Sequence, residues 1–340
     1  MTFHTFHRVV MATAVAATLT SASAADITGA GATFPYPIYS QWSEAYKKET
    51  GNQLNYQSIG SGGGIKQIIA KTVTFGASDI PMTAADQDKN GLVQWPMVMG
   101  GIVAVVNLDG VSTGDLTIDG PTLGDIFLGK IKSWDDAAIK KLNPDAKLPA
   151  APINVVHRSD GSGTSFNFTN YLDKVSTDWH AKIGVSQTPE WPTGVGSKGN
   201  EGVAGSVAQT KGAIGYVEYA YAKKNKLTYA AMINKDGKKV MPTVPAFQAA
   251  AANADWAHAP GYYQVLTDQP GAASWPLTAA SFILMDKAPS DKTASVDAVK
   301  FFGWAFDNGS KMAEDLDYIP MPASVVSLVK KTWAADIKNK

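Results

Sequence analysis

Residues 98–106 read Val-Met-Gly-Gly-Ile-Val-Ala-Val-Val and contain no charged side chain. A continuous apolar run of this length is typical of a strand that is buried on both faces, as in α/β proteins. A second, largely apolar stretch, 275–285, lies in the C-terminal quarter of the chain. Since the chain can leave one lobe through residues 100–107 and return through residues 275–285, these two stretches are candidates for connecting strands of a two-lobed body with a ligand cleft.

Helical and strand patterns alternate around this run, which predicts an α/β class with mostly parallel sheets. Residues 35–50 carry apolar side chains at helical spacing and end at Gly51, a common helix stop. Residues 54–59 then alternate as a strand. Further helices are expected at 65–70 and 164–175, and further strands at 74–77, 153–156, 213–217 and 281–285.

The chain has 340 residues, with 30 basic and 30 acidic side chains and no cysteine. This length suggests about two domains. A formal net charge of zero gives no basic field, so binding to nucleic acid is not expected. The lack of cysteine excludes disulfides and thiolate metal sites. Histidines also lack ligand spacing, so neither a metal nor a cofactor is expected.

The N-terminus has the pattern of a secretory signal peptide. Arg8 stands in a polar start, an apolar stretch follows over 9–19, and the small residues Ala22-Ser23-Ala24 form a cleavage site. Residues 1–24 are therefore expected to be removed on export, leaving a soluble mature chain of 316 residues. Arg158 is then the only arginine of the mature protein.

Three predicted strand-to-helix junctions are rich in glycine and hydroxyl residues: 28–34, 60–64 and 160–165. The first turn of a helix has unpaired N–H groups and a partial positive charge, so such a junction can hold an anion. Each one alone also fits a tight turn followed by a helix cap. The presence of three, one of them directly after Arg158, favours an anion-binding site.

Two charged residues refine this hypothesis. The guanidinium of Arg158 matches a tetrahedral oxyanion bidentately, although it is equally suited to a surface ion pair with Asp160. Asp79 follows a short predicted strand, and an ionised carboxylate only accepts hydrogen bonds. It would therefore accept from a protonated phosphate and repel sulfate. The alternative for Asp79 is a turn or helix-cap acid before Pro81.

Two stretches have the spacing of nucleotide-binding motifs but lack a feature that the motif requires. Residues 124–130 have the spacing of a P-loop, but Ile131 stands where a hydroxyl is required. Gly194, Gly196 and Gly199 match a dinucleotide fingerprint, but 191–193 make a poor preceding strand.

Six stretches, 28–34, 56–64, 75–79, 123–130, 158–165 and 212–219, resemble the PstS family, the periplasmic phosphate-binding proteins of the bacterial phosphate ABC transporter. The resemblance covers essentially the whole mature chain. It implies a periplasmic-binding-protein type II fold, in which two α/β lobes close on one phosphate. With the connecting stretches above, lobe I is expected at 25–102 and 277–340, and lobe II at 103–276.

The resemblance also assigns the site. It implies that Asp79 accepts the phosphate proton, that Arg158 is the charged donor, and that Asp160 pairs with this arginine. His157 stands where some relatives carry a second basic residue. The remaining implied ligand donors are Thr33, Phe34, Ser61, Ser162, Gly163 and Thr164.

The resemblance further implies the partners, which are a pair of inner-membrane permease subunits and, through them, the transporter ATPase. A periplasmic monomer without covalent chemistry is expected. Two alternatives stay open: a receptor for another tetrahedral oxyanion such as sulfate or arsenate, and a secreted phosphatase-like enzyme that uses Ser162 or His157.

Overall fold

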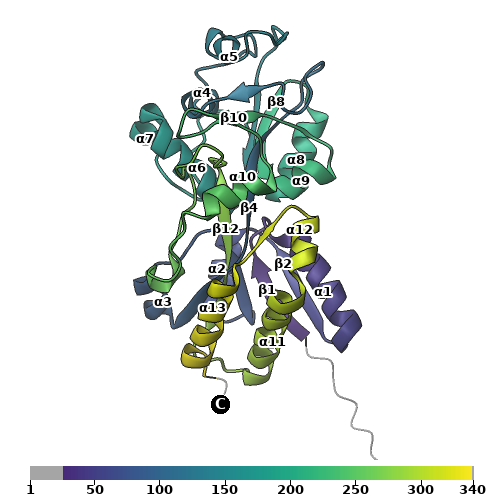
Figure 1. The fold of residues 1–340 in the computed structure, drawn as a ribbon, viewed down its shortest axis with the longest axis vertical. Coiled ribbons are helices and arrows are strands. Elements are labelled where there is room, and N and C mark those ends of the chain that lie inside the picture. The colour runs from purple at the N-terminus through teal and green to yellow at the C-terminus, as the bar shows by residue number, and fades with distance from the viewer. Residues whose placement is uncertain (1–25, 339–340) are drawn as a thin grey trace, which may run out of the picture.

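The structure is a computed structural model that describes residues 26–338. The predicted signal peptide, 1–24, lies outside the described residues. Figure 1 shows the helices and strands in two parts, one above the other, which are called here the lower part and the upper part. The lower part contains β1 (Asp26–Gly31), α1 (Tyr36–Thr50), β2 (Gln53–Ser58), α2 (Ser61–Ile69), β3 (Phe75–Ser78), α3 (Ala84–Asn90), α11 (Lys292–Asn308), α12 (Ser310–Asp315) and α13 (Ala323–Asp336).

The upper part contains most of the middle of the chain. Its elements are β5 (Thr117–Ile118), α4 (Gly120–Phe127), α5 (Ala137–Leu142), β6 (Asn154–Arg158), α6 (Gly163–Val175), α7 (Thr177–Lys182), β7 (Val195–Ser197), α8 (Gly199–Gln209), β8 (Ala213–Glu218), α9 (Tyr219–Lys224), β9 (Thr228–Tyr229), β10 (Ala231–Ile233), β11 (Lys239–Val240) and α10 (Val244–Ala251). A short 3-10 turn at Pro260–Tyr262 already lies against the lower part, where the Gly261 carbonyl accepts from the side chain of Gln87 in α3.

Two strands run between the parts, as the apolar stretches predict. β4 (Leu92–Val106) is buried along its whole length. Its first part pairs antiparallel with β12 (Thr278–Asp286) and β13 (Ile319–Pro320), and its last part pairs with β8 and β9. The resulting sheet has the order β2-β1-β3-β12-β4-β8-β6-β7. One long strand therefore belongs to the sheet of both parts.

The α/β class is confirmed, but the expectation of mostly parallel sheets is wrong. Parallel pairs are found toward the two ends of the sheet, where β1 pairs with β2 and β3, and β6 with β7 and β8. The strands between them, β12, β4 and β8, pair antiparallel. The antiparallel centre follows from the two connecting strands, because they run between the parts in opposite directions.

β4 begins at Leu92, whereas the apolar run predicts a start at Val98. Residues 92–97 are not predicted as strand because they contain Pro96, and proline lacks the N–H that a central strand requires. The structure accommodates Pro96 at a β-bulge, where the register with β12 shifts between Ser281 and Phe282.

α2 begins at Ser61, four residues before the predicted start at Ile65. Glycine is a poor helix former, and three glycines open this helix. A Cβ atom at Gly64 would lie 2.5 Å from the Cα atom of Gly31, so glycine allows the helix start to contact β1. The same glycines that mask the helix in the sequence thus bring its first turn close to the edge of the sheet.

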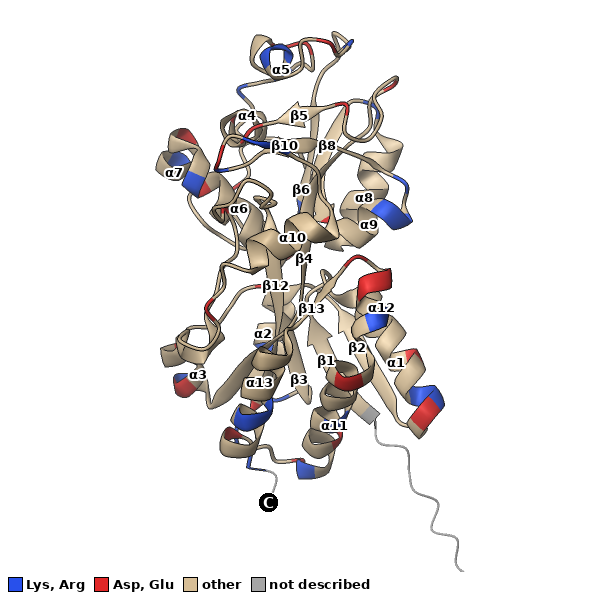
Figure 2. Ribbon diagram, in the orientation of Figure 1, with Lys and Arg blue, Asp and Glu red and all other residues tan. Residues whose placement is uncertain are grey.

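Burial of large apolar side chains holds the fold together in a chain without cysteine. Trp275 lies just before β12, and its indole N–H donates to the Ile102 carbonyl of β4 at 2.8 Å. Figure 2 shows charged residues of both signs spread over the outer helices, with few near β4, β12 and α10. Between residues 26 and 338, no helix has the length and apolar character needed to cross a membrane.

Candidate functional site

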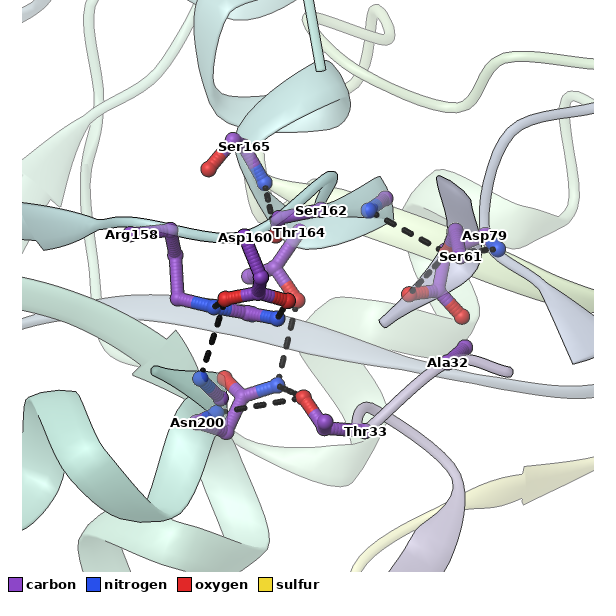
Figure 3. Close-up of polar contacts among 12 residues, drawn as sticks. Ala32, Thr33, Ser61, Asp79, Arg158, Asp160, Ser162, Thr164, Ser165 and Asn200 are labelled. Atoms are coloured by element: carbon purple, nitrogen blue, oxygen red, sulfur yellow. Dashed lines mark hydrogen bonds and ion pairs between the residues drawn. The ribbon is translucent and has the colours of Figure 1, made fainter. Parts of the chain in front are cut away.

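The three glycine-rich junctions meet where the lower and upper parts face each other (Figure 3). The lower part contributes Thr33 and Phe34 between β1 and α1, Ser61 at the start of α2, and Asp79 directly after β3. The upper part contributes the β6–α6 junction, with Arg158, Asp160, Ser162, Gly163 and Thr164. Except for the partly buried Asp160, all of these residues are buried.

Ser61 joins the two parts. Its Oγ accepts hydrogen bonds from the backbone N–H groups of Asp79 and Gly163, each at 3.1 Å. Two accepted hydrogen bonds occupy both lone pairs of a hydroxyl oxygen, so the Ser61 hydroxyl can only donate further, and its proton is directed at Oδ2 of Asp79, 3.5 Å away. The Gly163 N–H, which the resemblance assigns to the ligand, is directed at Ser61 in this structure.

Arg158 is a buried cation that Asp160 holds from one side. Its Nε lies 2.8 Å from Oδ1 of Asp160 and its Nη2 lies 2.5 Å from Oδ2. Burial disfavours the charge on Asp160, but the hydrogen bonds and positive charge of Arg158 outweigh burial and hold the Asp160 pKa below its ordinary value. The expected ion pair with Asp160 is thus present, but Arg158 is only 3% exposed, so the pair is buried and does not lie on the surface. Its Nη1 is buried and has no hydrogen-bond partner.

Asp79 is 1% exposed, and its Oδ1 is likewise buried without a partner. Burial raises the pKa of Asp79 to about 7, although the Ser281 hydroxyl, Arg158 and the Ser61 hydroxyl act in the opposite direction. The carboxylate does not cap the next helix, because Thr83 is the N-cap of α3. Asp79 is therefore a buried, titratable acceptor beside a buried cation.

Tyrosine hydroxyls fix the backbone of Thr33 and Phe34. Tyr221 from the upper part donates to the Thr33 carbonyl at 2.6 Å, and Tyr318 donates to the Phe34 carbonyl at 2.6 Å. In a planar trans peptide the N–H points away from the preceding carbonyl. Because the Thr33 carbonyl is held by Tyr221, the Phe34 N–H is directed away from that side.

Sequence reasoning missed Asn200, which is buried in the first turn of α8. Its side chain contacts the hydroxyls of Thr33 and Thr164 (Figure 3). The sequence signal for this residue is the glycine-rich stretch 194–199, which also matches a dinucleotide fingerprint poorly. β7 ends at Ser197 and α8 starts at Gly199, which makes a fourth strand-to-helix junction.

The site thus combines hydroxyl and guanidinium donors with one carboxylate acceptor. This set suits a small anion that also carries a proton, since donors bind the anionic oxygens and Asp79 accepts the proton. Within the described part of the chain, no group of three or more His, Asp or Glu side chains is placed to hold a metal ion.

The fold and the site define the chain as a binding protein of the PBP superfamily, to which it belongs: residues 16–308 match the family model described as the PBP superfamily domain. Within that superfamily it belongs to the PstS family of phosphate-binding proteins. The Phosphate-binding protein PstS of Pasteurella multocida (strain Pm70) is 53% identical over 313 residues, which cover 92% of this chain and 91% of the relative. Its namesake in Haemophilus influenzae (strain ATCC 51907 / DSM 11121 / KW20 / Rd) is 53% identical over 322 residues, covering 95% of this chain and 96% of the relative. The family predicted from the sequence is confirmed.

Solved structures share the fold at lower sequence identity. A high affinity periplasmic phosphate-binding protein, PfluDING, bound with phosphate, matches with a TM-score of 0.73 at 21% identity, over 92% of this chain and 96% of that chain. A phosphate binding protein from Stenotrophomonas maltophilia matches with a TM-score of 0.69 at 19% identity, over 94% of this chain and 97% of that chain. The predicted periplasmic-binding-protein fold is confirmed.

Proposed function

We propose that this chain binds one inorganic phosphate ion between its lower and upper parts. One observation carries the proposal: the buried Oδ1 of Asp79 and the buried Nη1 of Arg158 both lack a partner. A ligand that satisfies both must offer an acceptor to the guanidinium and a donor to the carboxylate. Phosphate offers both, as P–O⁻ and P–OH. The names of the PstS relatives support the same ligand.

Each predicted site residue then has a role in the complex. Arg158 binds an anionic oxygen through Nη1, the guanidinium nitrogen that does not pair with Asp160. Asp79 accepts from the phosphate hydroxyl and disfavours sulfate, which carries no proton at neutral pH. The donors to the other oxygens are the hydroxyls and N–H groups of Thr33, Phe34, Ser61, Ser162, Gly163 and Thr164, with Gly163 sharing its N–H between Ser61 and the ligand.

Closure of two lobes is the proposed mechanism. Lobe I comprises 25–102 and 277–340, and lobe II comprises 103–276. The Ile102 N–H donates to the Leu277 carbonyl at 2.8 Å. This hydrogen bond supports a hinge at the place where both connecting segments pass from one part to the other. Phosphate stabilises the closed state, because only there do Asp79 and Arg158 reach the same ion.

The same proposal covers transport. After export and removal of residues 1–24, the protein acts in the periplasm as a monomer. It delivers phosphate to the permease subunits of an ABC importer, which its ATPase drives, without covalent chemistry or a cofactor. The periplasmic phosphate-binding protein among the structural neighbours supports this location.

Calorimetric titration of the mature, phosphate-stripped protein at neutral pH tests the proposal. Tight one-to-one binding of phosphate with little response to sulfate is the expected result. Comparable binding of both would make the protein a general oxyanion receptor. Absence of binding, together with sustained turnover of a chromogenic phosphoester that Ser162→Ala abolishes, would replace the proposal with the enzyme alternative.

A further inference from the structure

We propose that Asn200 is a positioning residue that makes the Thr33 and Thr164 hydroxyls act as donors toward the bound anion. The inference rests on the proposed phosphate site, and it adds a residue that does not itself contact the ligand. Asn200 is completely buried in the first turn of α8. Figure 3 shows its amide facing both threonine hydroxyls.

The orientation of the Asn200 amide follows from its hydrogen bonds. The backbone N–H of Glu218 lies 2.8 Å from Oδ1 of Asn200. A backbone N–H can only donate, so the atom that faces it must be the amide oxygen. The NH₂ group is therefore directed at the opposite side, where Oγ1 of Thr33 lies at 2.7 Å and Oγ1 of Thr164 at 3.1 Å.

This orientation decides what the hydroxyls can do. An amide NH₂ has no acceptor capacity, so both hydroxyl oxygens must accept from Asn200. Oγ1 of Thr33 accepts a second hydrogen bond, from the backbone N–H of Asn200 at 3.1 Å. Both of its lone pairs are then occupied, and its only remaining hydrogen bond is one that it donates. Neither proton points at Asn200, which leaves both for an anionic oxygen.

Asn200 also connects the two parts of the molecule. Thr33 follows β1 in the lower part, whereas Thr164 and Asn200 begin α6 and α8 in the upper part. The neighbouring Gly199 N–H donates to Oδ1 of Asp160 at 3.0 Å, so the start of α8 also helps to hold the partner of Arg158. The first turn of α8 therefore orients hydroxyl donors of both the lower and the upper part toward the proposed ligand.

A buried asparagine elsewhere provides the matched control. Oδ1 of Asn143 accepts from the Thr117 N–H at 2.7 Å, and its Nδ2 donates to the carbonyls of Thr117 and Ile139 at 2.8 and 2.9 Å. The amide is oriented in the same way, but all its partners are backbone groups remote from the site. Asn143→Asp therefore reproduces the structural cost of burying a carboxylate without touching the proposed donors.

The first experiment compares phosphate affinity in Asn200→Asp, Asn200→Ala and Asn143→Asp by calorimetry at pH 8. Asn200→Asp turns the threonine hydroxyls toward a new acceptor and adds a negative charge, so we expect a loss of at least about 100-fold. Asn200→Ala leaves the hydroxyls free to rotate, with an expected loss of about 10-fold. Asn143→Asp should bind as the wild type does. Equal affinities of the Asp and Ala variants at position 200 would overturn the inference.

A double-mutant cycle separates positioning from simple stability and needs no Asp variant to fold. If Asn200 acts through Thr33, the pair Asn200→Ala and Thr33→Val should lose little more affinity than Thr33→Val alone. The hydrogen bonds of the Ser61 hydroxyl are with Asp79 and Gly163, so the pair Asn200→Ala and Ser61→Ala should lose the product of the single losses. Equal additivity in both cycles would contradict the positioning role. Failure of the wild type to bind phosphate would instead overturn the proposed function.

Discussion

The peptide nitrogen of Gly163 lies 3.1 Å from the hydroxyl oxygen of Ser61, although 102 residues separate them in the chain. This contact brings the first turn of α6 against the first turn of α2. A Cβ atom at position 163 would lie 2.4 Å from Oγ of Ser61 and 2.6 Å from Cβ of Asp79. The close approach of the two parts therefore requires the absence of a side chain at this position.

Gly163→Ala should therefore block closure without unfolding either part. We expect phosphate affinity to fall at least about 100-fold, because the added methyl group separates Asp79 from Arg158 and removes charge-assisted hydrogen bonds. Calorimetry gives the affinity and thermal unfolding gives the stability. Gly205→Ala is the control, because a Cβ atom there meets nothing within 4 Å. Wild-type affinity in Gly163→Ala would show that the closed contact is not needed for binding.

Arg158→Lys should weaken phosphate binding by about 10- to 100-fold, since an ammonium cannot pair with Asp160 through two nitrogens and present a third to the ligand. Titration of the variant with phosphate measures the loss. Lys211→Ala, which removes an exposed ion pair with Asp109, should change nothing. If Arg158→Lys binds phosphate as tightly as the wild type, a single positive charge at this position is sufficient for binding, which would contradict the prediction.

Glu218 is completely buried at the end of β8, and burial raises its pKa well above the ordinary value. As pH rises above the unfolded-state pKa, unfolding releases a proton that the folded protein retains, so the wild type loses stability. Glu218→Gln removes this loss. Relative to the wild type, the variant should therefore gain stability as pH rises from 4 to 8.

Urea unfolding of the wild type, Glu218→Gln and the exposed control Glu190→Gln at several pH values measures this gain. A stability difference between Glu218→Gln and the wild type that does not change with pH would show that the buried carboxyl retains an ordinary pKa.

Local chemistry explains why the glycine-rich junctions that the structure brings together could be picked out as a candidate site. Glycine beside Ser or Thr marks a strand-to-helix junction, and the single mature arginine stands directly before one of them. The acceptor role of Asp79 could be proposed from the sequence because a carboxylate in an anion site needs a proton on the ligand. These are properties of short segments, so a sequence without coordinates already contains them.

The parts that could not be predicted depend on contacts between distant segments. Pro96 is compatible with a central strand because β4 bulges beside it, with Met97 as the extra residue between the pairs that Val98 and Pro96 form with β12. The role of Asn200 depends on Thr33, which lies 167 residues away, and Tyr318 reaches Phe34 across 284 residues. No local pattern distinguishes such an asparagine or tyrosine from one that caps a helix or fills a core.

Asp79 carries the central claim that the site selects an anion which bears a proton. Its pKa of about 7 means that the side chain is largely ionised at pH 8 and protonated at pH 5.5. Ionised Asp79 repels sulfate, whereas protonated Asp79 can donate to it. Sulfate binding by the wild type should therefore strengthen as pH falls through about 7, and sulfate binding by Asp79→Asn should not change in this way.

The most direct test is the ratio of phosphate to sulfate affinity at pH 8, measured by competition calorimetry on the stripped mature wild type and Asp79→Asn, with the exposed Asp145→Asn as control. The account predicts a strong preference for phosphate in the wild type and the control. In Asp79→Asn the ratio should fall by at least about 10-fold, because one repulsive contact to sulfate is removed. An unchanged ratio in Asp79→Asn would contradict the claim.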